Sequence, residues 1–293
     1  MFLFEDKTKV ITATANGECT DHFSASSAAA AMASGLLALA VEANKNLTWR
    51  DMQHIIIRSS RADKRIIKAK DWNSNGANLT ASNYVGFGLM DAYGLVSLAM
   101  NWTTVAPQLT CTIPYLHIDR VIPSADALQV TTSLKDVANL CPEINFLEHV
   151  QVRLSLNYTI AEDLEVNLTS PQGTISRLIQ RRSKGSFQRA TSLTNWKVLT
   201  LHHWGENPSG IWMLSLKNSR LEHENTGMLF DWSLIMFGTA TDPLKGNPHV
   251  PVITVTPGQE SDTNSALAGL EITGVTIGAV VVSCILGISI YIC

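Results

Sequence analysis

CTDHFSASSAAAAMASGLLALAVEANKNLTWRDMQHIIIRSS, residues 19–60, is the stretch that decides the fold of the N-terminal part of this chain. Its polar start runs into an apolar, Ala-rich segment, Ser27–Ala43, which predicts a helix buried inside a larger fold. Ser27 then lies at the helix N-terminus, where unpaired backbone N–H groups favour negative charge. An attacking alkoxide and a developing oxyanion would both gain from that field, although a serine here is more often only an N-cap. Ser27 is therefore a candidate nucleophile.

The residues around this helix predict more α/β structure. Thr48, followed three residues later by Asp51, predicts a capping box for a second helix, Trp49–Ser59. Its apolar residues are expected to share one buried face: Trp49, Met52, Ile55 and Ile56. The other N-terminal segments predict a short strand, a polar surface loop and a third helix: Lys9–Thr14, residues 61–84 and Leu89–Trp102.

The pattern of apolar residues changes from about Val121 to Ala240, after a transition over Pro107–Pro123. Short runs with alternating apolar residues predict strands, with turn signals at residues 170–173 and 207–210 between them. The predicted strands are Val150–Tyr158, Leu164–Leu168, Ile211–Leu216 and Trp232–Phe237. This spacing is typical of an antiparallel sandwich or jelly roll.

The C-terminal segments differ from both folded parts. Residues 241–269 are rich in Pro, Thr, Ser and Gly and predict an extended stalk. Ile272–Cys293 has no charged residue. At about 1.5 Å per residue this segment would span roughly 30 Å of hydrocarbon, so we expect a single transmembrane helix over residues 270–293.

Several motifs together resemble the furin/kexin-type proprotein convertases, a branch of the subtilisin-like serine proteases. CTDHFSASSAAAAMASG is similar to their active-serine segment, and ANKNLTWRDMQHIIIRSS and VGFGLMDAYGLVSLA resemble later parts of their catalytic domain. LEHVQVRLSLNY, EDLEVNLTSPQGT, HHWGENPSGIWMLSL and TGMLFDWSLIMFGTA resemble their second module, the P domain. The resemblance covers roughly residues 8–240 in the family's order.

The resemblance implies a fold of four parts. An α/β remnant, the C-terminal part of a subtilisin-like domain, would occupy residues 1–105. An all-β jelly-roll or sandwich P domain would occupy residues 106–240. The stalk and the transmembrane helix would follow at 241–269 and 270–293.

The resemblance also implies a function. The family cleaves precursor proteins after paired basic residues, uses calcium and acts as a type I membrane protein of the secretory pathway, in the Golgi, the trans-Golgi or at the cell surface. Ser27 falls on the nucleophile. The catalytic Asp and His precede this serine in the subtilisin-type order, so we expect them, and most calcium sites, upstream of Met1. Serine needs a base, so the chain alone should be inactive. Ala25 stands where the family has Gly, which raises the alternative of a non-catalytic pseudoprotease or membrane-anchored binding protein.

Cysteines and sequons fit a secretory location. Cys111 and Cys141 match a P-domain disulfide of the family. Five N-x-S/T sequons are candidate N-glycosylation sites: Asn46, Asn78, Asn101, Asn157 and Asn167. The net charge of −3 is small, which argues against a nucleic-acid partner. The expected partners are precursor substrates with dibasic sites, and membrane lipid around the C-terminal helix; no metal-ligating residue is assigned within the chain.

Overall fold

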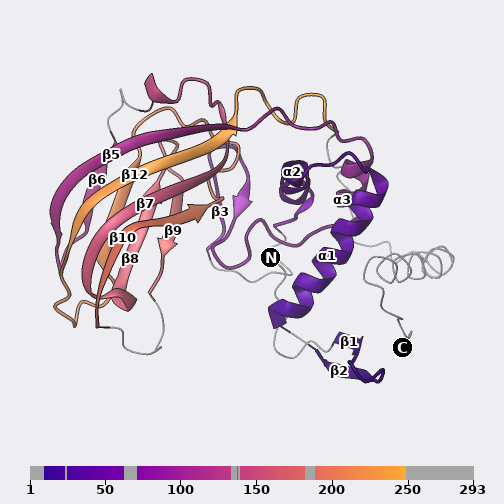
Figure 1. Cartoon of the computed structure of the whole chain (residues 1–293), viewed down its shortest axis with the longest axis horizontal. Helices are drawn as coiled ribbons and strands as arrows, with labels where there is room; N and C mark the ends of the chain where they lie inside the picture. Colours follow the sequence, from indigo (N-terminus) through magenta and orange to yellow (C-terminus); the bar gives the residue numbers. More distant parts are fainter. Residues whose placement is uncertain are drawn as a thin grey trace, which may run out of the picture. The chain divides into compact units, whose positions relative to one another are not determined.

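The computed structural model describes residues 10–23, 25–62, 71–132, 137, 139–181 and 189–248. The chain divides into two compact units, which are treated separately (Figure 1). The helical unit takes its residues from Met1–Lys68, Tyr84–Thr104 and Gly246–Cys293. The sandwich unit takes its residues from Ala69–Asn83 and Val105–Lys245. The predicted stalk beyond residue 248 and the predicted transmembrane helix lie outside the described residues.

The helical unit begins with a β-hairpin. Strand β1, Val10–Ala13, pairs antiparallel with β2, Cys19–Phe23, and confirms the strand predicted at this position. Gly17 lies in the connecting turn with φ of 80°, a conformation that glycine adopts without a steric penalty. Helix α1, Ala25–Ala43, follows and begins two residues before the predicted start.

Two capped helices complete this unit. In α2, Trp49–Ser59, the predicted capping box is present, because the Thr48 hydroxyl accepts from the Asp51 N–H and the Asp51 carboxylate accepts from the Thr48 N–H. Helix α3, Ala92–Met100, is capped by Asp91 and starts three residues later than predicted. Both α1 and α2 pack against α3.

The predicted buried face of α2 is wrong at its first position. Trp49 is 64% exposed, whereas Asp51 is fully buried along with Ile55. The Asp51 carboxylate is buried because it accepts a hydrogen bond of 3.0 Å from the indole N–H of Trp102. Because Asp51 has a tertiary hydrogen-bond partner, the buried face of α2 includes this polar residue and differs from the face predicted from apolar residues alone.

Helix α1 also departs from the expectation of burial. Ala28 and Ala40 are buried, but Met32 and Val41 are 50% and 45% exposed. Among the described residues one helical stretch, Ser26–Ala43, is long and apolar enough by length and composition to cross a membrane; its mean hydropathy is 1.4 and 17% of it is buried. Core helices of soluble domains and signal sequences meet the same test of length and composition.

The sandwich unit contains two four-stranded antiparallel sheets, which agrees with the predicted antiparallel sandwich (Figure 1). The first sheet has the order β10-β7-β12-β5 and the second the order β6-β11-β8-β9. The first-sheet strands are β5 (Leu109–Ile122), β7 (Phe146–Ile160), β10 (Arg189–Thr200) and β12 (Gly227–Thr239). The second-sheet strands are β6 (Leu128–Thr131), β8 (Leu164–Thr169), β9 (Ile175–Ile179) and β11 (Met213–Asn218). A short 3-10 helix, η1 (Ala161–Asp163), joins β7 to β8.

The core of this unit arises from the period-two pattern of its strands. Alternate residues of β8 and β11 are buried, and Trp212 and Trp232 are fully buried within the same apolar cluster. The indole N–H of Trp212 donates to the Pro208 carbonyl at 2.9 Å, inside the turn predicted at residues 207–210. The four predicted strands are therefore confirmed, with β11 starting two residues later than expected.

Two segments differ from their predictions. Residues 107–123, taken as a transition, contain the 14-residue strand β5. This strand pairs only with β12, so Pro114 lies on an edge strand, where a missing N–H is tolerated. The predicted surface loop, residues 61–84, contains the hairpin of β3 (Asn73–Ser74) and β4 (Thr80–Ala81), and Asn75 within it is 6% exposed.

Candidate active site

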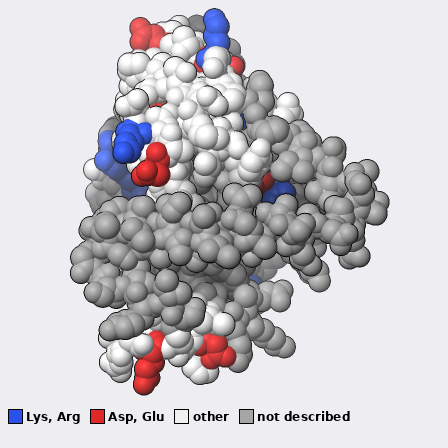
Figure 2. Space-filling model, turned by 90° about the vertical axis from the view of Figure 1, so that its right-hand side faces the viewer, with Lys and Arg blue, Asp and Glu red and all other residues white. Residues whose placement is uncertain are grey.

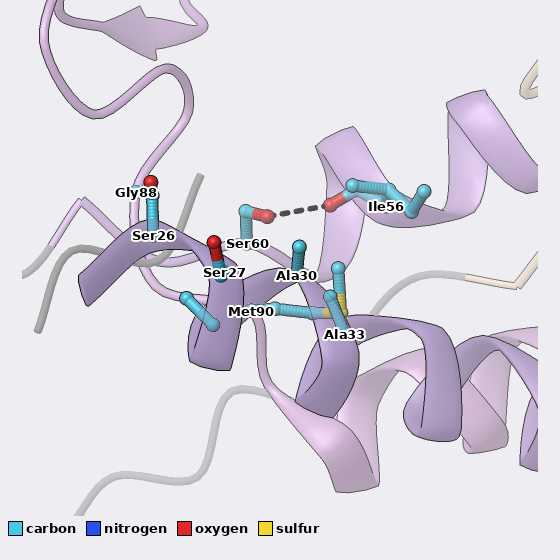
Figure 3. Close-up of a pocket in the computed structure, with 9 residues that line it drawn as sticks. Ser26, Ser27, Ala30, Ala33, Ile56, Ser60, Gly88 and Met90 are labelled. Carbon is cyan, nitrogen blue, oxygen red and sulfur yellow. Dashed lines mark hydrogen bonds between the residues drawn. The ribbon is translucent and has the colours of Figure 1, made fainter. Parts of the chain in front are cut away.

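Ser27 lies in the first turn of α1, at the edge of a cavity of about 450 Å³ (Figure 3). Its side chain is exposed. The cavity lies entirely within the helical unit and is lined by Ser26, Ser27, Ala29, Ala30, Ala33, Ile56, Ser60, Gly88 and Met90. Small and apolar side chains dominate this lining, so the Ser27 hydroxyl borders space rather than a packed neighbour.

No His, Asp or Glu is among the described residues that line this cavity. His22, the histidine nearest to Ser27 in sequence, belongs to β2, and its Nε2 lies 3.6 Å from the Asp21 carboxylate. The side chain of His22 is 89% exposed. The described residues therefore give Ser27 a helix N-terminus but no proton acceptor in its cavity.

Two chain segments form one wall of the cavity. Ser60 and Met90 belong to segments that are joined by an antiparallel bridge between Arg61 and Leu89, with N–H to carbonyl distances of 2.8 and 2.9 Å. The Ser60 hydroxyl donates to the Ile56 carbonyl at 2.7 Å (Figure 3). Gly88 has φ of 110°, and an added Cβ would overlap the Arg61 carbonyl, so this wall requires glycine.

The predicted disulfide between Cys111 and Cys141 is present in the sandwich unit. It links β5 to the turn before β7 across 30 residues of sequence. Constraining a loop of this length in the unfolded chain stabilises the fold by about 3 kcal/mol in the chain-entropy model.

The five sequons occupy different environments. Asn46, Asn78, Asn101 and Asn157 are exposed, and Asn78 lies in a turn with φ of 60°. Asn157 lies in β7 and accepts a hydrogen bond from the Met228 N–H at 2.8 Å. Asn167 is only half-buried, but its amide nitrogen donates to the Glu165 carboxylate at 3.0 Å. These environments favour Asn78 over Asn167 as a glycan acceptor.

Asp163 is the centre of a polar cluster that the sequence did not reveal. Its carboxylate lies 3.1 Å from Arg220 Nε and 2.8 Å from His223 Nδ1, and accepts from the Asn225 amide at 2.9 Å. Burial, followed by the charge of Asp163, raises the pKa of Tyr158 to about 12. Asp163 is 2% exposed, so this side chain joins η1 to the β11–β12 connection rather than facing solvent.

Glu206 forms a second buried polar centre in the sandwich unit. It is 1% exposed and accepts from the Gly76 N–H at 2.9 Å and from the Thr174 hydroxyl. Burial acts to raise its pKa, but the His203 ring 3.7 Å away and hydrogen bonds from Thr174, Ser170 and Gly76 lower the pKa of Glu206 to about 2. The carboxylate is therefore ionised at neutral pH.

The described acidic and basic residues bear on binding of calcium and of nucleic acid. Among the described residues, no group of three or more His, Cys, Asp and Glu side chains could hold a metal ion, so these residues do not fit a calcium site. On the face drawn in Figure 2, the described basic and acidic residues are interspersed within wide uncharged areas. The expectation that no nucleic acid binds stays a prediction.

Comparison with known proteins defines the class. The Subtilase family model matches residues 5–88, and the Proprotein convertase P-domain model matches residues 147–236. The first match contains Ser27 and the second contains most of both sheets. The chain therefore combines a subtilase-like fold with a β-rich P domain, as in serine proteases of that group.

Individual relatives narrow the class to one family. The chain is 38% identical over 245 residues to furin of Rattus norvegicus, and 38% identical over 247 residues to proprotein convertase subtilisin/kexin type 4 of Mus musculus. Each match covers 84% of this chain, and 30% and 37% of the respective relatives. The chain belongs to the furin/kexin-type proprotein convertases. It spans about a third of the length of these relatives.

A solved structure supports the same fold. The serine protease of Aeromonas sobria, in its complex with a chaperone, superposes with a TM-score of 0.60 over 78% of this chain and 46% of that chain. Its sequence identity is 21%, so the likeness concerns the fold alone.

Proposed function

We propose that this chain is the C-terminal part of a membrane-anchored serine endoprotease that cleaves precursor proteins after paired basic residues. The observation that carries the proposal is Ser27, which lies in the first turn of α1 beside an open cavity, inside the segment that matches the Subtilase family. Ser27 is the proposed nucleophile. We keep the division into residues 1–105, 106–240, 241–269 and 270–293 as part of the proposal, with residues 69–83 assigned to the P-domain unit.

The proposed chemistry is acyl transfer. The Ser27 hydroxyl attacks the scissile carbonyl while a histidine takes its proton, and the N-terminus of α1 favours the negative charge that develops. The scissile C–N bond then breaks as the histidine gives that proton to the leaving amine, and water hydrolyses the acyl-enzyme. Because the described lining of the cavity holds no base, the histidine and its orienting carboxylate come, in this proposal, from residues that precede this chain. The chain by itself is then inactive.

Substrate choice and calcium rest on the family alone. Relatives of this family process precursors at dibasic sites, and the proposed substrates are precursor proteins of that kind. The described residues of this chain do not fit calcium, so the proposal places calcium sites outside them. No step of the proposed reaction runs through the metal.

The proposed location is the secretory pathway, with one type I transmembrane anchor at residues 270–293. An uncharged segment of 22 residues, Ile272–Cys293, supports this anchor. The stretch Ser26–Ala43 is also long and apolar enough to cross a membrane, but it packs on α3 and carries the proposed nucleophile, so we assign it to the protease fold. Asn46, Asn78, Asn101 and Asn157 are the proposed glycan acceptors with exposed side chains.

The test compares two serines of the same helix in the full-length protein. Ser27→Ala should abolish cleavage of a secreted reporter with an Arg-Arg site, because the nucleophile is lost. Ser34→Ala, an exposed position in α1, is the matched control and should cleave normally. Undiminished cleavage by the Ser27→Ala variant would reject the assignment.

A second candidate function is a non-catalytic, membrane-anchored binding protein. The absence of a base from the described lining of the Ser27 cavity favours it for this chain by itself, and so does Ala25 at the family's glycine position. A fluorophosphonate probe separates the two on the full-length protein. Labelling that is lost with Ser27→Ala supports the protease, whereas no labelling in the folded full-length protein supports the binding protein.

A further inference from the structure

One segment of the subtilase-matched region folds with the P domain. Residues 5–88 match the Subtilase family, yet Ala69–Asn83 belongs to the sandwich unit. The described part of this segment is the β3–β4 hairpin and its connecting turn, residues 75–79, which we call the Asn-Gly turn. The chain leaves the helical unit after Lys68 and returns to it at Tyr84.

Asn75 anchors the Asn-Gly turn to the sandwich. Its amide nitrogen donates to the carbonyls of His202 and Trp204, both at 2.9 Å. Its amide oxygen accepts from the N–H groups of Ala77 and Leu79 at 3.0 and 2.9 Å. Asn75 is 6% exposed, so all four of these bonds are largely shielded from water.

Gly76 and Glu206 form the second anchor. The Gly76 N–H donates to the buried Glu206 carboxylate, and an added Cβ would overlap the Gln172 side chain. The backbone of Glu206 is itself held, because its carbonyl accepts from the Leu147 N–H at 2.9 Å at the start of β7. The Asn-Gly turn is thus hydrogen-bonded to a residue whose backbone is tied to the start of β7.

The chain on either side of Ala69–Asn83 forms a wall of the serine cavity. The Arg61–Leu89 bridge closes the chain segment at its base, and Arg61 Nε lies 3.3 Å from the Asp91 carboxylate. Ser60 and Gly88, the residues that precede Arg61 and Leu89, both line the cavity of Ser27 (Figure 3). Only four residues separate Asn83, the last residue of the segment held by the sandwich, from Gly88.

We propose that Asn75 and Glu206 are positioning residues for the serine cavity, which hold the Asn-Gly turn in the P domain and thereby keep the Arg61–Leu89 bridge closed. If the Asn-Gly turn loses its hydrogen bonds to the sandwich, the chain between Arg61 and Leu89 is no longer held in the middle. The Arg61–Leu89 bridge then closes a longer free loop, which costs more conformational entropy. The coupling runs through the covalent chain. The inference rests on the proposed function only because it calls the Ser27 cavity the catalytic one.

The test is residue-resolved hydrogen exchange on the full chain in detergent micelles. Asn75→Ala should speed exchange of the Arg61 and Leu89 amides roughly tenfold, because the buried carbonyls of the seat lose their donor. The matched control is Asn73→Ala, an exposed asparagine of the same hairpin whose amide donates to the Asp71 carbonyl at 3.3 Å. Glu206→Ala should act like Asn75→Ala, and Glu206→Gln, which keeps an acceptor for Gly76, should retain most of the protection.

Amides of β7 and β12 report on the sandwich itself. In Asn75→Ala they should exchange as in the unsubstituted chain. Faster exchange at Ala77 and Leu79 with unchanged rates at Arg61 and Leu89 would overturn the coupling. Equal acceleration throughout β7 and β12 would also overturn it, since the turn would then be a general support of the sandwich. These rates need no proteolysis, so a failure of the proposed activity leaves this test intact.

Discussion

The stability of the sandwich unit should fall in acid through Glu206. The pKa of this carboxyl is lowered from 4.5 to about 2, and one pKa unit corresponds to about 1.4 kcal/mol. The folded-state pKa is depressed, so the stabilisation is fully present above about pH 4.5 and is lost as pH falls towards 2. Ionised Glu206 contributes about 3 kcal/mol to the free energy of unfolding, of which about 2 kcal/mol should be lost by pH 3.

The assay is urea unfolding at pH 6 and at pH 3, followed by the fluorescence of the buried Trp212 and Trp232. Comparison with Glu206→Gln removes the contribution of the other carboxyl groups, which both proteins share. The advantage of the unsubstituted chain over the variant should shrink by about 2 kcal/mol between the two pH values. An advantage that is the same at pH 6 and pH 3 would refute the assignment of an ionised, hydrogen-bonded Glu206.

Three further perturbations test other parts of the structure. Replacing both Cys111 and Cys141 by Ala should lower the free energy of unfolding of the sandwich by about 3 kcal/mol in a urea titration, and a change below about 1 kcal/mol would contradict the loop-closure argument. Asp163→Ala should cost about 3 kcal/mol, because Arg220 and His223 lose their shared carboxylate; a stability equal to that of the unsubstituted chain would show that the cluster is dispensable. Asn78→Gln should remove one endoglycosidase-sensitive step in gel mobility after synthesis with microsomes, whereas Asn167→Gln should remove none; the reverse pattern would contradict the ranking of these two sequons.

Local signals in the sequence located the three described α-helices and five of the twelve described strands. The capping box at Thr48 and Asp51 and the alternation in β7, β8 and β12 depend on neighbours three residues or two residues away, so they can be recognised from a single chain. Strand β5 was missed because Pro114 interrupts its pattern. Its position at a sheet edge, which makes that proline acceptable, is a property of the assembled sheet.

The polar parts of the structure could not be predicted in this way. From the sequence alone, Asn75 is a loop residue. Its role depends on the carbonyls of His202 and Trp204, more than 120 positions downstream, to which its amide donates in the folded chain. Asp51 likewise is buried only because Trp102 reaches it. For Ser27, the resemblance to a family indicated the residue, and the structure adds its cavity and the bridge that borders it.

The membership of residues 71–83 in the sandwich unit has a consequence for how this protein can be recombined. The sandwich unit is not contiguous in sequence, because a cut made between Met100 and Leu109 separates it from the β3–β4 hairpin, which belongs to the same compact unit. In a chimera that exchanges only the downstream part between two convertases, the β3–β4 hairpin of one protein would have to bind the residues of the other that take the place of His202, Trp204 and Glu206. A chimera should therefore exchange the β3–β4 hairpin together with the downstream part of the sandwich unit.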